Sequence, residues 1–191
     1  MNLFKALGLV SLFLLNVSCT GSVYIHNEPV PSHKDPRSYL FDKISVKFEP
    51  GNDPLAMDLF TRTVISRSLA REVHQVQDLN KASFPILSVD LSLKMDDHLT
   101  AKAFKEFGLG FSLFLLEPVF WFDVDYVANG TITLITDKGA IGPFAAYASS
   151  TTRAKWFSLG ELATLHDKAQ QDTFSAVVDD LLNQVRQRVS H

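Results

Sequence analysis

The chain has 191 residues, of which 46% are hydrophobic and 20% charged, and its formal net charge is −3 at pH 7. This length fits one domain with a sizeable core. A net negative charge without a basic stripe argues against a nucleic-acid-binding protein. With a single cysteine, the chain can form neither an intrachain disulfide nor a cysteine-built zinc site.

The first residues have the order of a secretory signal peptide. Lys5 supplies a positive charge, residues 6–15 form an apolar run, and small residues follow. The apolar run is too short to span a bilayer, which takes about 20 residues. We therefore predict a signal peptide over residues 1–18. Its removal leaves 173 residues with a net charge of −4, because Lys5 is the only charged residue in it.

Cys19 lies where this leader would be cleaved. Val17, Ser18 and Cys19 resemble the end of a bacterial lipobox, in which the thiol is acylated, the leader is removed and the cysteine becomes the new N-terminus. The residue three positions before the cysteine is usually Leu or another aliphatic residue, and here it is Asn16. The alternatives to a lipid anchor at Cys19 are plain secretory cleavage nearby and a thiol without a role.

The stretch after the leader is polar and contains Pro29, Pro31 and Pro36. Proline interrupts regular structure, and a lipid-anchored domain needs a spacer between itself and the membrane. We therefore predict a flexible tether over residues 19–40 and a single domain over residues 41–191.

The first half of this domain predicts a strand, a helix and a second strand. Apolar and polar residues alternate over residues 42–48 and 84–95, which is typical of half-buried strands. Between them, Asp53 is a suitable N-cap with Pro54 at the first helical position. Apolar residues at helical spacing then predict a helix over residues 54–73.

The second half predicts two more strands. One alternation continues over residues 122–136 and keeps its parity through Gly130, so we place the turn at residues 137–139. A further strand is expected over residues 140–153, with Pro143 indicating an irregular start or an edge position.

Apolar residues at helical spacing predict a last helix from residue 162 or 164 to 189. This order of elements predicts an α+β fold. We expect an antiparallel sheet of about four strands with two long helices packed on one face.

Residues 104–121 form an apolar cluster that includes Phe107, Phe111, Phe114 and Trp121. Its continuous apolar part is about ten residues long, too short for a membrane-spanning helix. The segment is either core under the sheet or a surface element that contacts a partner or the membrane. We assign the four aromatic residues to such a contact.

Acidic residues lie near the ends of two predicted strands, as Asp96 and Asp97 with His98, and as Asp123 and Asp125. Paired carboxylates can bind a hard cation or act as acid and base, but acids two apart on a strand are usually a solvated face. No zinc-spaced histidines, phosphate loop or nucleophile elbow occur. We therefore expect no metal, no cofactor and no catalytic residue. An enzyme would need a convergent polar pocket around these residues.

The lipobox-like residues and the order of the elements resemble small bacterial outer-membrane assembly and export lipoproteins. That group includes the lipopolysaccharide-assembly, curli-export and exopolysaccharide-export lipoproteins. The resemblance implies palmitate or another fatty acid at Cys19 and a role as an assembly factor in a larger envelope machine, often as an oligomer. Thr20 stands where an Asp would retain a lipoprotein at the inner membrane, which implies the outer membrane, facing the periplasm.

These features predict a non-enzymatic, lipid-anchored periplasmic accessory protein. We expect it to contact the bacterial membrane through its lipid and to support an envelope assembly or export complex. Its expected protein partner is another envelope protein or a second copy of itself. The alternative is a binding module for an apolar ligand, such as a lipid or glycolipid, between helices and sheet, which the 15 phenylalanines motivate.

Overall fold

The computed structural model describes residues 22–26, 39–52, 54–79, 82–111, 121–154 and 159–190. The elements in chain order are β1 (Ser22–His26), β2 (Phe41–Phe48), α2 (Pro54–Ser66), β3 (Ala70–Gln75), β4 (Ile86–Asp96), α3 (Leu99–Phe111), β5 (Phe122–Thr136), β6 (Gly139–Ala154) and α4 (Leu159–Val189).

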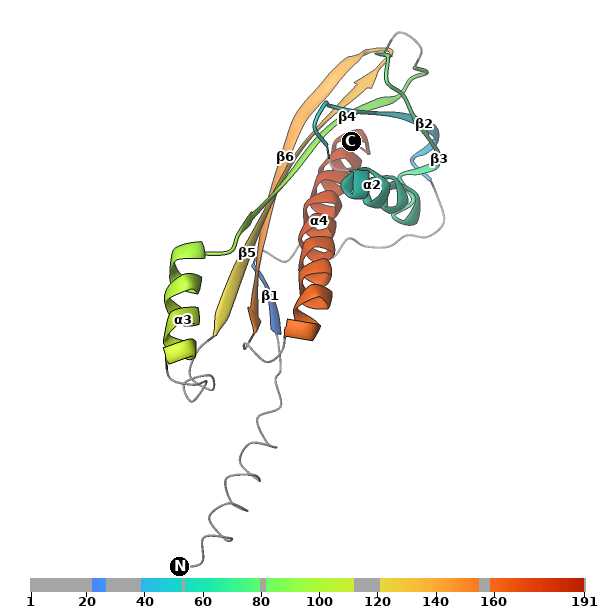
Figure 1. Ribbon diagram of the computed structural model, residues 1–191. Coiled ribbons are helices and arrows are strands. Elements are labelled where there is room, and N and C mark those ends of the chain that lie inside the picture. Colours follow the sequence, from blue (N-terminus) through green and yellow to red (C-terminus); the bar gives the residue numbers. More distant parts are fainter. Residues whose placement is uncertain are drawn as a thin grey trace, which may run out of the picture.

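The strands form one sheet in the order β1-β6-β5-β4-β2-β3. β2 runs parallel to both of its neighbours, and the other pairs are antiparallel. The α+β class is therefore confirmed, but two details of the expectation are wrong. The sheet is mixed and has six strands, and the described residues contain three helices. Figure 1 shows the sheet curling around α2 and α4, with α3 beyond one end.

The core lies between the sheet and the two inner helices. It is built from alternate residues of β2, β4 and β5 together with one face of α2 and one face of α4. α4 packs tightly on the sheet at Gly130, where an added Cβ would lie 2.7 Å from the side chains of Leu181 on α4 and Leu91 on β4. The side chains fill this crossing, so an apolar ligand has no room between helix and sheet at that point.

Toward the α3 end, the interior continues as a small cluster of Val124, Tyr126 and Ala169. A buried hydrogen bond of 2.6 Å joins the Ser150 and Thr173 hydroxyls and connects β6 to α4 there. The inner face of the sheet at this end is therefore already covered by α4.

The predicted helix over residues 54–73 is too long. α2 ends at Ser66, and the residues from Ala70 onward form β3, parallel to β2. Ser68 has a φ of 55°, its N–H donates to Ile65 O, and Leu69 N–H donates to Val64 O. These are the two hydrogen bonds of a Schellman motif, which ends a helix. Glycine usually occupies the left-handed position of this motif. Because serine occupies it here, the sequence did not indicate that the helix ends at this point.

α4 holds this turn in place. The Arg67 guanidinium donates to both carboxylate oxygens of Asp179, with 2.8 Å between Nε and Oδ1. Arg186 Nη2 donates to the carbonyl oxygens of Arg67 and Ser68 at 2.9 and 3.0 Å. The last helix therefore fixes the crossover that makes β3 parallel to β2.

β1 lies inside the stretch predicted as a tether. Residues Ser22–His26 pair with β6, with Ser22 opposite Arg153 and His26 opposite Ser149. This part of the stretch therefore belongs to the sheet. Val23, Tyr24 and Ile25 are good strand formers, but the prolines and polar residues that follow them led to the prediction of a tether.

The other predicted strands are confirmed within two residues at each end, as β2, β4, β5 and β6. Gly130 lies inside β5, and the reversal to β6 lies at residues 137–139, as predicted. The β5–β6 register shifts between Ile132 and Leu134, opposite the region of Pro143, which fits an irregular strand start. α4 begins at Leu159, three residues before the earliest predicted start.

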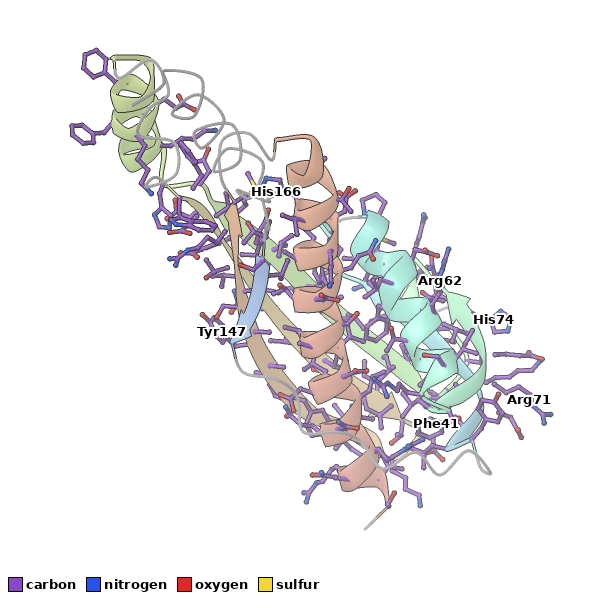
Figure 2. The ribbon with its side chains drawn as sticks, turned by 90° about the horizontal axis from the view of Figure 1, so that it is seen from below. Phe41, Arg62, Arg71, His74, Tyr147 and His166 are labelled. Atoms are coloured by element: carbon purple, nitrogen blue, oxygen red, sulfur yellow. The ribbon has the colours of Figure 1, made fainter. Side chains whose placement is uncertain are left out.

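The edge strand β3 lies far from α3. Figure 2 shows Arg71 and His74 at the opposite end of the molecule from α3. Lys43 and Glu72 form an ion pair of 3.1 Å there, and the Arg71 guanidinium lies 5.8 Å from the centre of the Tyr39 ring. Charged side chains along an edge strand discourage pairing with another chain, so this edge is protected.

Candidate functional site

The candidate site is the end of the sheet from which α3 projects. β4 ends at Asp96, and the chain turns through Asp97 and His98 into α3. Lys102 N–H donates to His98 O at 2.9 Å, which closes the first turn of the helix. Leu, Ala, Lys and Glu, all good helix formers, occupy several of its positions.

α3 carries two exposed aromatic side chains. Phe104 and Phe107 lie three positions apart and therefore share a face of the helix. Their side chains are 75% and 74% exposed. Two large apolar side chains exposed on one helix face indicate an interaction site.

The other side of α3 contacts the start of β5. Lys105 Nζ donates a hydrogen bond to the main-chain oxygen of Trp121. The same amine lies 5.7 Å from the centre of the Phe122 ring, a cation–π distance. These contacts direct the charge of Lys105 toward the sheet.

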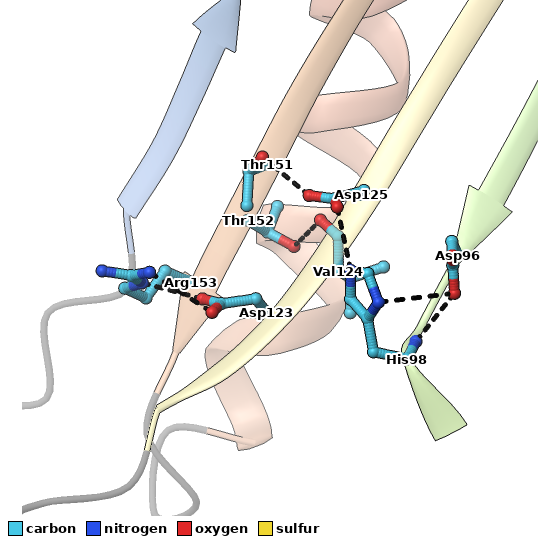
Figure 3. Close-up of polar contacts among 8 residues, drawn as sticks. All are labelled: Asp96, His98, Asp123, Val124, Asp125, Thr151, Thr152 and Arg153. Atoms are coloured by element: carbon cyan, nitrogen blue, oxygen red, sulfur yellow. Dashed lines mark hydrogen bonds and ion pairs between the residues drawn. The ribbon is translucent and has the colours of Figure 1, made fainter. Parts of the chain in front are cut away.

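His98 fixes the turn between β4 and α3. Its φ is 48°, a left-handed conformation that is uncommon for a residue with a side chain. Its N–H donates to Asp96 Oδ1 at 2.9 Å, and its Nε2 lies 2.8 Å from Asp125 Oδ2. Figure 3 shows the imidazole between these two carboxylates. The ring therefore links the start of α3 to both β4 and β5.

The cluster continues across the sheet to β6. Asp125 lies opposite Asp96 on one side and Thr151 on the other, and Thr151 Oγ1 donates to Asp125 Oδ1 at 2.7 Å. Arg153 donates to Asp123 through Nε at 2.7 Å and Nη2 at 3.3 Å. Paired positions on neighbouring strands bring together groups that are far apart in sequence.

The electrostatics of this cluster favour a charged imidazole. The hydrogen bond to Asp125 raises the pKa of His98, partial desolvation opposes this, and the negative charges of Asp96, Asp125 and Asp123 add to the increase. The positive charge of His98 is therefore stabilised between the acidic residues.

The arrangement differs from that of a hydrolytic triad. In such a triad the histidine lies between the acid and the nucleophilic hydroxyl. Here Asp125 lies between His98 and Thr151, so the hydroxyl of Thr151 donates to a carboxylate and does not meet the imidazole. Among the residues that the structure describes, no group of three or more His, Cys, Asp or Glu side chains is placed to hold a metal ion. The geometry suits positioning of α3.

The predicted site residues fall into three groups. Phe107 is exposed on α3, and Trp121 is partly buried beside Lys105. Phe111 is the last residue of α3, and its side chain is not described. Cys19 and Phe114 lie outside the described residues. The structure thus places Phe107 and Trp121 at one end of the sheet.

The polar candidates are brought together more closely than sequence alone indicates. Asp96, His98 and Asp125 join in one hydrogen-bonded cluster, with the ion pair of Asp123 beside it. Phe104 is the first residue of the predicted 104–121 segment but was not among its four assigned contact residues, although its three-residue spacing from Phe107 is a signal. Sequence reasoning missed Lys105, Thr151 and Arg153, and the two β6 residues depend on strand register.

β1 begins at this same end of the molecule. Ser22 pairs with Arg153, which pairs with Asp123, and the strand of Asp123 pairs with β4. Figure 1 shows the start of β1 and α3 at the same end of the sheet. The chain therefore enters the described fold at the same end of the sheet as α3.

No described helix is long and apolar enough to cross a membrane. No family model and no curated protein matches the chain. Among solved structures, the chain is similar to the rare lipoprotein B from Shewanella oneidensis, with a TM-score of 0.44, 13% identity and coverage of 78% of this chain and 99% of that chain. It is also similar to a minor lipoprotein from Acinetobacter baumannii, with a TM-score of 0.40, 14% identity and coverage of 78% and 90%. At these values no function is transferred from either protein.

Proposed function

We propose that this chain is a non-enzymatic, lipid-anchored accessory protein of the bacterial cell envelope. Cys19 carries the lipid, and the domain faces the periplasm at the outer membrane. There it supports an assembly or export complex through contacts with an envelope protein or a second copy of itself. The anchor and the location are inferred from the signal-like leader, the lipobox-like residues and Thr20. The complex is inferred from the resemblance to assembly and export lipoproteins.

The observation that carries this proposal is the position of β1. Ser22 is three residues after Cys19 and is held against Arg153 in the sheet. A lipid on Cys19 would therefore hold one defined end of the domain at a membrane. That end carries Phe104 and Phe107, which the core leaves exposed.

The geometry of the polar cluster supports a non-enzymatic role. His98 has one ring nitrogen bonded to Asp125 and the other 3.8 Å from Asp96 Oδ1. An imidazole held between two acids is stabilised as a cation, which makes it a poor general base. A role in holding α3 accounts for each of these contacts.

The first test is the intact mass of the protein extracted from membranes, with a Cys19→Ala control. A mature chain that starts at Cys19 and carries acyl mass supports the anchor. An unacylated chain would refute it.

The second test is the native size of the complex after gentle solubilisation. We expect an assembly larger than the monomer, and its loss in Cys19→Ala, because the anchor holds the domain beside its partner. A monomer in both samples would refute the assembly role while leaving the anchor intact.

A further inference from the structure

We propose that the Phe104–Phe107 face of α3 inserts into the same lipid surface that holds Cys19. This inference rests on the lipid anchor of the proposed function and identifies what covers the exposed aromatic face. The domain then has two membrane attachments, a covalent lipid and an amphipathic helix.

The first argument is the length of the connection. Ser22 is three positions after Cys19. An extended chain spans at most about 3.6 Å per position, so Ser22 lies within about 11 Å of the acylated residue. Ser22 is fixed to β6 opposite Arg153. The end of the sheet is therefore kept at the membrane surface, and a long spacer does not separate them.

The second argument is the lateral position of α3. β1 and β4 are separated by β6 and β5 in the sheet. Neighbouring strands are about 4.8 Å apart, so three strand spacings put the start of α3 about 15 Å from β1 at the same end of the sheet. α3 has 13 residues and a length of about 20 Å. A helix of this size at this position lies within reach of the surface that holds the lipid.

The third argument is the chemistry and size of the exposed face. Two phenylalanine rings, each about three-quarters exposed, offer about 300 Å² of apolar surface. A stable protein interface takes about 800 Å² per partner, so these rings alone are small for a protein contact. Aromatic side chains on one face of a helix are suited to the boundary between the headgroups and the acyl chains of a membrane.

The fourth argument is orientation. His98 ties the first turn of α3 to Asp96 and Asp125, and Lys105 ties the next turn to Trp121. These contacts lie toward the sheet, whereas Phe104 and Phe107 are exposed. The helix therefore presents a fixed apolar face.

The experiment places p-benzoylphenylalanine, a photoreactive phenylalanine analogue, at position 104 of the full chain. A second variant carries it at position 107. The matched control carries it at Tyr147, an aromatic residue that is 51% exposed on β6. Tyr147 is six residues from Arg153, or about 20 Å further along the strand. The membrane-extracted proteins are reconstituted in phosphatidylcholine vesicles, irradiated, and analysed by intact and peptide mass.

We expect a mass increase of one phospholipid on the peptide carrying position 104 or 107, and none on the peptide carrying position 147. Acylated protein without a lipid adduct at 104 and 107, or with equal adducts at 147, would overturn the inference while the anchor stands. Irradiation in intact cells that gives only an adduct of protein mass at 104 would overturn it in favour of a protein contact.

The same mass spectra test the proposed anchor independently, because they show whether Cys19 carries acyl mass. If Cys19 is unacylated, the proposed anchor is wrong, and a maleimide phospholipid is coupled to its thiol to restore the short connection between the lipid and Ser22. A lipid adduct at position 104 in that sample still supports insertion of α3. Its absence overturns the inference.

Discussion

Gly130 provides the sharpest test of how α4 packs on the sheet. A Cβ at this position would lie 2.7 Å from Leu181 Cδ1 and Leu91 Cδ2 and 2.8 Å from Val177 Cγ1. Carbon atoms in contact prefer at least about 3.5 Å, so each distance is short by about 0.7 Å or more. The three side chains are buried in the central core, and moving one of them displaces others.

The expected result of Gly130→Ala is a loss of about 1–2 kcal/mol in the free energy of unfolding. Overpacking costs about 1–3 kcal/mol. Alanine recovers about 0.5–1 kcal/mol by restricting the unfolded chain. Because Gly130 lies inside β5 and has no left-handed φ, the predicted loss is steric.

Urea unfolding of the leaderless chain, followed by circular dichroism, measures this free energy. A double-mutant cycle with Leu181→Ala separates steric strain from a general loss of packing. The Leu181 truncation alone should cost about 2–5 kcal/mol, and in the Gly130→Ala background it should cost about 1 kcal/mol less, since it makes room for the new methyl group. Full stability of Gly130→Ala, or strict additivity of the two changes, would refute the close approach.

Three further predictions concern the candidate site and the crossover turn. The ion pair of His98 with the carboxylate beside it should stabilise α3 fully below pH 6.5 and be lost as the pH rises through the raised pKa; hydrogen exchange of the α3 amides should show this pH dependence, and His98→Gln should remove it. Phe104→Ser combined with Phe107→Ser should change the free energy of unfolding by less than about 0.5 kcal/mol, and a larger loss in urea unfolding would place the rings in the core. Arg67→Ala and Asp179→Ala should each cost about 1–2 kcal/mol, because each leaves a charged partner of a two-point hydrogen bond unpaired; thermal unfolding with the double mutant should show coupling, and independent effects would contradict it.

Most of the sheet was predictable from the sequence because its signals are local. β5 keeps one parity of apolar residues over 15 positions, and the turn that follows ends at Gly139 with a φ of 129°. Such a pattern buries one face of the strand wherever its partners lie. α4 was predictable for the same reason, since its apolar stripe repeats over several turns.

Elements that depend on distant partners were missed. β3 has charged or polar residues at four of its six positions, and its parallel pairing with β2 requires the left-handed turn at Ser68. A glycine there would have indicated the helix end. β1 contains the strand formers Val23, Tyr24 and Ile25, but it is only five residues long, and its place in the sheet depends on its pairing with β6.

The candidate site combines both kinds of information. The acids near Asp96 and Asp125 are visible in the sequence, but their convergence needs the β4–β5 register that places them opposite each other. Thr151 enters through the β5–β6 register. Sequence analysis could therefore name the acidic residues but could not show that His98 joins them.

The same register explains why the α3 phenylalanines lie outside the core. Since Asp96 pairs with Asp125, the chain between them leaves the sheet and returns to it at the same end. The inner face there is already covered by Tyr126 and Ala169, both fully buried. Topology therefore leaves Phe104 and Phe107 no place in the interior, whatever their hydrophobicity. They lie exposed at the end of the sheet where Ser22 pairs with Arg153, so the position of the face proposed to contact lipid follows from the strand register.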